Sequence, residues 1–207
     1  MFHNSRTLFY TCQVMERTNR TPSEKIGPGV LNAAISILDE EGPDGFTVRA
    51  IALRADVAPM AIYNHFNGVN GVLEALWIEG FDRLRQAITF DSPEPGEDLR
   101  NAGRSYRRFA LENRGLYTVM FMHRFRNFEP SLEASQISAQ TYETLVDNVE
   151  RCQRNELFAR APARDTAQVI WSACHGYVSL ELLGINFAAD REATFELLLS
   201  ALEGSSL

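Results

Sequence analysis

Two short stretches of the chain carry side chains suited to contacting DNA. Arg49 can donate two hydrogen bonds to one guanine, and Asn64 can pair with adenine or donate to a phosphate. Ala58, Pro59 and Met60 are small or apolar, so their side chains can touch a thymine methyl group but cannot hydrogen-bond. Such side chains could contact base edges only if the fold presents both stretches on one face beside DNA.

The surrounding residues 46–66 have the pattern of two short helices joined by a tight turn. Thr47 is a good N-cap, because its hydroxyl can accept a hydrogen bond from a free amide of the first turn. Asp56 tolerates the backbone of a tight corner, and Pro59 suits the first turn of the next helix. The apolar residues recur at helical spacing and are Val48, Ile51, Ala52, Ala55, Val57, Ile62 and Phe66. The pattern predicts a helix-turn-helix whose second helix can enter the major groove.

This stretch closely resembles the DNA-binding domain of the TetR family of transcriptional regulators, from about Pro28 to Leu84. The matching residues are Thr47-Val48-Arg49, Ile51-Ala52, Ala55-Asp56-Val57, Ile62-Tyr63, His65-Phe66 and Val72-Leu73. The resemblance implies that Thr47 and Arg49 lie near phosphate and base edges. It also implies that the recognition helix begins at residues 58–60 and that Tyr63 and His65 hold the phosphate backbone.

One position departs from the family pattern. The family usually has a lysine three residues after the His-Phe pair, where it clamps a phosphate, whereas this chain has Val69. Gly68 and Gly71 flank that position and can let backbone amides at the helix N-terminus hold the phosphate instead. The missing cation predicts weaker DNA binding. It also keeps an alternative open, a dimeric ligand-binding or adaptor protein that has lost operator binding.

Charge, hydropathy and cysteine content limit the remaining classes. The net charge of −7 is distributed as 6 basic and 7 acidic residues in 1–70 and 14 basic and 20 acidic residues in 71–207. DNA affinity depends largely on phosphate neutralisation, so we expect modest non-specific affinity. The chain has neither a transmembrane length of apolar residues nor the apolar core of a signal peptide, which predicts a cytoplasmic protein without a membrane partner. Cys12, Cys152 and Cys174 are widely spaced, so we expect no disulfide framework and no metal site.

The predicted fold is all-α, with an N-terminal three-helix helix-turn-helix domain followed by a helical ligand-binding and dimerisation domain. Residues 1–27 read as a flexible arm, either disordered or reaching DNA through its basic residues, because Gly27-Pro28-Gly29 should interrupt any helix. Residues 28–70 form the DNA-binding domain, and residues 71–90 form a helix that touches both domains. Residues 97–207 form the effector-binding and dimerisation domain, in the layout of the same family. Its expected helices are Glu97–Asn113, Arg114–Arg126, Pro130–Asn155, Pro162–Phe187 and Asp190–Leu202.

A further motif near the C-terminus bears on dimerisation. Trp171-Ser-Ala-Cys-His175-Gly176 resembles the Trp-x-x-x-His-Gly signature of one class of C-terminal domain in this family. Glycine in mid-helix costs roughly 1 kcal/mol relative to alanine, which a close helix–helix approach would explain. We therefore expect residues 162–187 and 190–202 to form a four-helix bundle with their symmetry mates in a homodimer. Closure of the monomer core is the alternative.

Aromatic and sulfur-containing side chains of the second domain suggest a site for a small hydrophobic effector. In the family that this chain resembles, the effector site lies among the fourth to eighth helices. The candidate ligand-binding residues are Trp77, Phe81, Tyr106, Met120, Phe121, Phe125, Tyr142 and Cys174. A helical core of this size needs such residues in any case, so core packing is the competing interpretation for each of them.

The sequence contains no pattern typical of an enzyme. Cys174 and His175 are neighbours and so point about 100° apart on a helix, which prevents a nucleophile–base pair. No Gly-x-Ser-x-Gly elbow, phosphate-binding glycine loop or His-Glu-x-x-His motif occurs. We expect neither catalysis nor a cofactor. The expected function is a homodimeric, ligand-responsive repressor of a near-palindromic operator in double-stranded DNA.

Overall fold

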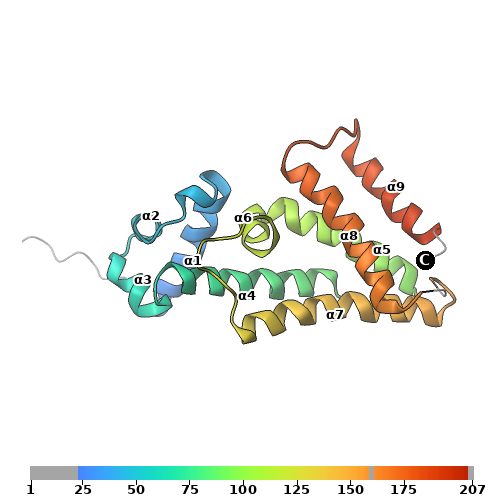
Figure 1. Cartoon of the computed structure of the whole chain (residues 1–207), viewed down its shortest axis with the longest axis horizontal. Coiled ribbons are helices and arrows are strands. Elements are labelled where there is room, and N and C mark those ends of the chain that lie inside the picture. The colour runs from blue at the N-terminus through green and yellow to red at the C-terminus, as the bar shows by residue number, and fades with distance from the viewer. Residues whose placement is uncertain (1–22, 159–160, 205–207) are drawn as a thin grey trace, which may run out of the picture.

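The computed structural model describes residues 23–158 and 161–204, and these residues form helices and loops without a strand (Figure 1). The predicted all-α class is confirmed. Residues 1–22, which make up most of the predicted arm, lie outside the described residues. Figure 1 shows a small helical domain at one end, which we call the head, and a larger helical body at the other.

The head consists of α1 (Ser23–Glu40), a 3-10 turn η1 (Pro43–Gly45), α2 (Val48–Arg54) and α3 (Pro59–Phe66). The first helix was expected to start at Pro28, and this start was wrong, because α1 begins at Ser23 and continues through Pro28. A proline inside a helix lacks an amide donor and crowds the carbonyl four residues earlier, yet α1 continues through it and is anchored by its buried residues Val30, Ala34 and Ile37. Part of the predicted arm is therefore helical.

The turn between α2 and α3 has the predicted chemistry. The Thr47 hydroxyl accepts a hydrogen bond from the Ala50 amide at 3.2 Å, as expected of an N-cap. Asp56 has φ of 52°, a left-handed conformation that aspartate adopts more easily than most residues. Ile51 and Ile62 are fully buried, which fixes α2 against α3 and leaves the opposite surface of α3 exposed.

Helix α4 (Val69–Ile88) belongs to the head at its start and to the body along most of its length. Its first turn packs tightly, because a Cβ atom at Gly71 would overlap the backbone carbonyl of Phe66. Its buried residues are Val72, Leu73, Leu76, Gly80, Phe81, Leu84 and Ile88. Figure 1 shows α4 and α7 lying side by side along the body.

The body contains α5 (Pro95–Glu112), α6 (Arg114–Tyr117), a π-helical segment η2 (Thr118–Met122), α7 (Leu132–Arg154), α8 (Ala163–Leu182) and α9 (Arg191–Gly204). Two predicted helices are shorter than expected. The helix predicted to reach Arg126 ends at Met122, and the helix predicted to reach Phe187 ends at Leu182 before Gly184, whose φ is +73°. Asp190 caps α9 as predicted, with its carboxylate accepting from the Ala193 amide at 3.0 Å.

Ion pairs join the helices of the body. Arg107 on α5 donates two hydrogen bonds, at 2.8 and 2.7 Å, to the buried Glu181 carboxylate on α8. At the start of α5, the buried Asp98 accepts from Arg151 on α7 at 2.9 Å. Burial alone would raise the pKa of Asp98, but hydrogen bonds from Ser92 and Arg151 outweigh it and hold that pKa below its ordinary value. The body is thus fastened by paired charges as well as by its apolar core.

Among the described helices, none combines the length and apolar character needed to cross a membrane.

Candidate DNA-binding surface and ligand cavity

The eight predicted DNA-contacting residues all lie on the exposed surface of the head. They are Thr47, Arg49, Ala58, Pro59, Met60, Tyr63, Asn64 and His65. Large apolar side chains are normally covered, yet Met60 is 64% and Tyr63 53% exposed, while Ile62 between them is fully buried. The exposed residues of α3 therefore form a largely uncovered surface of the head, with the Tyr63 ring lying beside Gly68. That they bind DNA stays a prediction.

The electrostatics of the head single out one arginine. Arg54 at the end of α2 is held by ion pairs to Glu40 and Glu41 at 2.6 and 2.9 Å, so much of its charge is neutralised. Arg49 is exposed and has no ion pair with any residue that the structure describes. Of the two arginines of the head, Arg49 is thus the one available for phosphate or guanine.

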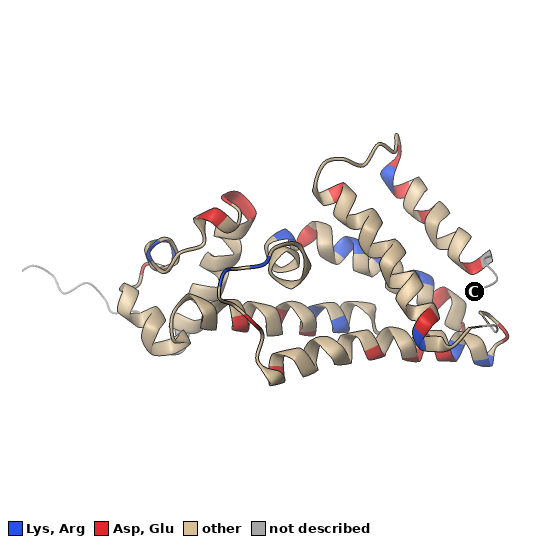
Figure 2. Ribbon diagram, in the orientation of Figure 1, with Lys and Arg blue, Asp and Glu red and all other residues tan. Residues whose placement is uncertain are grey.

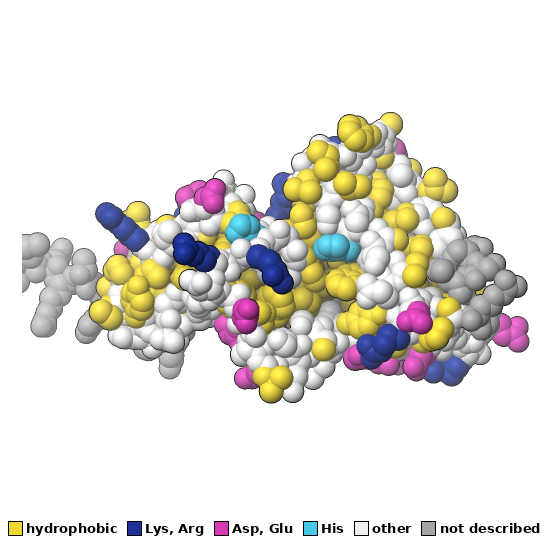
Figure 3. Space-filling view, in the orientation of Figure 1, with side chains coloured by type: hydrophobic (Ala, Val, Ile, Leu, Met, Phe, Trp, Pro, Cys, Tyr) yellow, Lys and Arg dark blue, Asp and Glu magenta, His cyan; other side chains and the backbone are white. Residues whose placement is uncertain are grey.

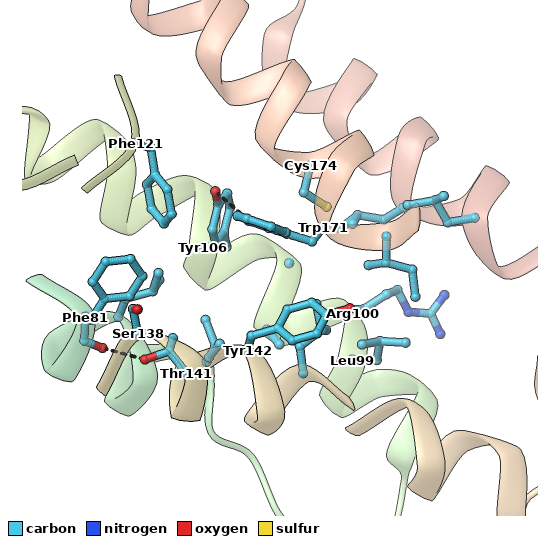
Figure 4. A pocket seen from close by; sticks show the side chains of 18 of the residues that line it. Phe81, Leu99, Arg100, Tyr106, Phe121, Ser138, Thr141, Tyr142, Trp171 and Cys174 are labelled. Carbon is cyan, nitrogen blue, oxygen red and sulfur yellow. Dashed lines mark hydrogen bonds between the residues drawn. The ribbon is translucent and has the colours of Figure 1, made fainter. Parts of the chain in front are cut away.

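The body encloses a cavity of about 400 Å³, within the range of roughly 300–1,000 Å³ typical of small-molecule sites. It lies between α4, α5, η2, α7, α8 and α9. Figure 4 shows Phe81, Tyr106, Phe121, Tyr142 and Trp171 projecting into one shared space. The predicted ligand-binding residues on its wall are Trp77, Phe81, Tyr106, Met120, Phe121, Tyr142 and Cys174. The structure therefore gathers seven of the eight candidates around one space, and their binding of a ligand remains a prediction.

Phe125 is the candidate that does not line the cavity. Its ring packs against Phe46 in the head, with the ring centroids 5.5 Å apart, and against His123 at 4.7 Å. The chain was expected to be helical from Arg114 to Arg126, which would carry Phe125 one helical turn after Phe121. This was wrong, because the helix ends at Met122 and the chain then turns toward the head.

A buried polar cluster stands at one end of the cavity. The hydroxyls of Tyr106 and Tyr117 lie 2.8 Å apart, and each contacts Nδ1 of His175, at 3.0 and 2.7 Å. Trp171 donates from Nε1 to the Tyr106 hydroxyl at 3.3 Å. Sequence analysis missed Tyr117 and His175 as cavity neighbours, because helix periodicity does not reveal contacts between residues 58 or more positions apart.

Burial keeps these groups neutral. It raises the pKa of the Cys174 thiol to about 12 and, despite hydrogen bonds that lower it, that of Tyr117 also to about 12. It raises the pKa of Tyr106 well above its ordinary value and lowers the pKa of His175. At neutral pH this end of the cavity therefore offers hydroxyl and imidazole groups without net charge.

The charged residues of the cavity wall lie at its opposite end. Arg100 on α5 donates to Glu203 on α9 at 2.9 Å and to Glu97 at 3.1 Å. Neither Arg100 nor Glu203 was among the predicted site residues, and no sequence signal distinguished them from other surface charges. Because Arg100 is already paired, the cavity as a whole suits an uncharged, mainly apolar molecule.

Two family models match the chain over most of its described length. Residues 30–76 match the model for bacterial regulatory proteins of the tetR family, and residues 99–202 match the tetracyclin repressor-like C-terminal domain. The chain belongs to the TetR family. It is therefore a DNA-binding transcriptional regulator with a helix-turn-helix head, and the family resemblance seen in the sequence is confirmed.

Individual relatives agree with this family assignment. The HTH-type transcriptional regulator YobS of Bacillus subtilis is 24% identical over 155 residues, which are 73% of this chain and 76% of YobS. The tetracycline repressor protein class D of Escherichia coli is 33% identical over 89 residues, 41% of this chain and 39% of the repressor. The structure of the fatty acid degradation regulator FadR from Bacillus halodurans superposes with a TM-score of 0.72 at 20% identity, covering 86% of this chain and 98% of FadR. The FadR likeness concerns the fold.

Proposed function

We propose that this TetR-family regulator is a homodimeric repressor that leaves a near-palindromic operator when a small hydrophobic molecule enters the cavity of the body. The observation that carries the proposal is the position of α4, which begins beside the recognition helix α3 and ends on the cavity wall through Phe81, Leu84 and Ile88. A molecule that fits only one arrangement of α4 favours that arrangement, and the head follows. The name of the tetracycline repressor relative supports the sign of regulation.

The proposed operator contact uses the exposed side chains of α2 and α3. In a dimer, two recognition helices would enter successive major grooves roughly 34–36 Å apart. Arg49 would donate to phosphate or guanine, Tyr63 and His65 would hold phosphates, and Asn64 would reach a base edge or a phosphate. Ala58, Pro59 and Met60 at the start of α3 would meet apolar base edges. Thr47 would mainly cap α2, where its hydroxyl already accepts the Ala50 amide.

Selection of genomic DNA fragments tests this part of the proposal. Purified wild-type protein should enrich fragments that share a near-palindromic site, and the double variant Arg49→Ala/Tyr63→Ala should enrich none. Both residues are exposed, so the variant should unfold at the same temperature as wild type. If intact wild-type dimer enriches no site at low salt, operator binding is refuted and the chain is better described as a ligand-binding or adaptor protein.

The proposed dimer uses an exposed apolar strip on α8 and the turn that follows it. Its large members Val169, Leu180, Leu183, Ile185 and Phe187 are 42–98% exposed. Figure 3 shows hydrophobic side chains gathered over α8 and the turn toward α9. Gly176 is also exposed, and a Cβ atom there would have no neighbour within 4 Å in the described chain. This open space leaves a close approach to another chain as the explanation for a mid-helix glycine.

Substitution of Gly176 by leucine separates the dimer from the monomer fold. The new side chain has room within one chain but would hold two α8 helices apart. We therefore expect the dissociation constant of the dimer to rise at least about tenfold. Sedimentation equilibrium measures the change, and Glu150→Leu on α7 controls for added surface hydrophobicity. An unchanged dissociation constant of the Gly176→Leu dimer would contradict the proposal that α8 forms the interface.

A further inference from the structure

The segment His123–Ser131, which we call the basic loop, connects η2 to α7 and is fastened to the head. Phe125 packs against Phe46 at the start of the helix-turn-helix, and the Asn70 side chain donates to the Asn127 carbonyl at 2.9 Å. In Figure 1 this loop leaves the body and passes over the head end of α1 and α4 before α7 begins. A loop of the ligand-binding body is thus held beside the start of α4.

Two arginines of the basic loop point away from the protein. A turn closes the middle of the loop, where the Phe128 amide donates to the Phe125 carbonyl at 3.3 Å and Asn127 has φ of 59°. Phe125 is turned inward onto the head, whereas Arg124 and Arg126 are both exposed. Neither arginine has an ion pair or side-chain hydrogen bond to any residue whose side chain the structure describes. Figure 2 shows the two charges on the loop, and Figure 3 shows basic side chains exposed on this face.

The head itself is poor in positive charge for a DNA-binding domain. Residues 23–70 hold three basic and six acidic residues, a net charge of −3. Arg54 is neutralised by Glu40 and Glu41, and Val69 occupies the first position of α4, where a phosphate-binding lysine was expected from the family resemblance. Binding to DNA requires cations near the phosphates, so other parts of the chain must supply them.

The basic loop lies where such cations are needed, because Asn127 is hydrogen-bonded to Asn70, the residue directly after Val69. The acidic residues nearest in sequence do not cancel it. Glu129 is the one carboxylate within the loop, so Arg124 and Arg126 outnumber it, and Glu74 on α4 accepts from the Ser131 amide at 3.3 Å at the α7 end of the loop. Arg124 and Arg126 therefore give the loop a positive face beside the start of α4.

We propose that the basic loop is a second DNA-contacting element, in which Arg124 and Arg126 bind operator phosphates in place of the missing lysine. This inference rests on the proposed function, since it presupposes that the head engages DNA. The loop directly follows Met120 and Phe121, which line the cavity. A molecule that displaces these two residues would also move the arginines, so the effector would weaken phosphate contacts as well as change the head.

The test compares charge-removing and charge-conserving variants on labelled DNA. Arg124→Gln/Arg126→Gln and Arg124→Lys/Arg126→Lys are titrated against a random-sequence duplex and the genomically selected operator over a range of salt concentrations. Arg154→Gln/Arg191→Gln is the matched control, because it removes two exposed charges from the far end of the body. Thermal unfolding of each variant verifies that the fold persists.

The glutamine variant should bind both duplexes at least about tenfold more weakly, and its log–log salt slope should fall by roughly 3 to 4 for a dimer. The lysine variant should keep most of the wild-type slope, because lysine neutralises a phosphate as a point charge. If the glutamine variant binds DNA with wild-type affinity and an unchanged salt slope, the loop contact is refuted and the proposed function stands. If wild type binds neither duplex at low salt, both the function and the loop contact are refuted.

Discussion

Replacement of Cys174 by phenylalanine is expected to weaken the binding of small hydrophobic molecules at least about tenfold while leaving the fold intact. Cys174 is 4% exposed, and its thiol lies on the cavity wall opposite Arg100 and Tyr142 (Figure 4). A larger side chain in a packed core usually costs stability, but here it has free volume of about 400 Å³ to enter. The ring would occupy the space that a ligand needs and should raise the unfolding temperature slightly.

Fluorescence titration with the uncharged probe N-phenyl-1-naphthylamine measures this effect. We expect wild type to bind the probe and Cys174→Phe to bind it at least about tenfold more weakly. Cys174→Ala is the matched control, because it removes the same thiol but leaves the cavity open, and it should stay within about threefold of wild type. Equal binding by all three proteins would show that the probe, and by extension an apolar effector, binds elsewhere.

Replacement of Arg107 by methionine should destabilise the body by about 3–5 kcal/mol. The side chain of Glu181 is only 6% exposed, and Arg107 donates both of the hydrogen bonds that its carboxylate receives in the described structure. Methionine keeps much of the apolar stem but leaves a buried charge uncompensated, which is the costly half of breaking an ion pair. Urea denaturation at fixed protein concentration measures the loss.

The double variant Arg107→Met/Glu181→Leu provides the control. Removing both charges eliminates the unpaired carboxylate, so most of the lost stability should return. Such recovery would assign the effect to the buried pair between α5 and α8. A double variant as unstable as the single one would instead show that packing of the arginine stem dominates.

The helix-turn-helix of the head was predictable from sequence, because the sequence signals for it are local. The Thr47 cap, the spacing of Ile51 and Ile62 and the Pro59 start are all set within a few residues, and the structure follows each of them. The start of α1 was not predictable in the same way. Pro28 is a local signal against a helix, yet α1 runs through it, so local propensity was overridden.

The cavity was predictable in composition but not in shape. Residue type marked Phe81, Tyr106 and Cys174 as candidates for this site, and each lines the cavity. Phe125 does not line the cavity, because a π-helical turn after residue 117 and an early helix end change the direction of its side chain. A 3.6-residue period does not anticipate this change. The Arg100–Glu203 pair joins residues 103 positions apart, and such a contact depends on the tertiary fold alone.

Release of the selected operator by hydrophobic small molecules tests most directly whether the cavity controls DNA binding. Wild type, Cys174→Phe and Cys174→Ala are bound to the labelled operator and exposed to fractions of an organic extract from the cells that make the protein. We expect some apolar fraction to release wild type and Cys174→Ala, whereas Cys174→Phe should stay bound. Release of Cys174→Phe at the same concentration as wild type would contradict the claim that the cavity controls DNA binding.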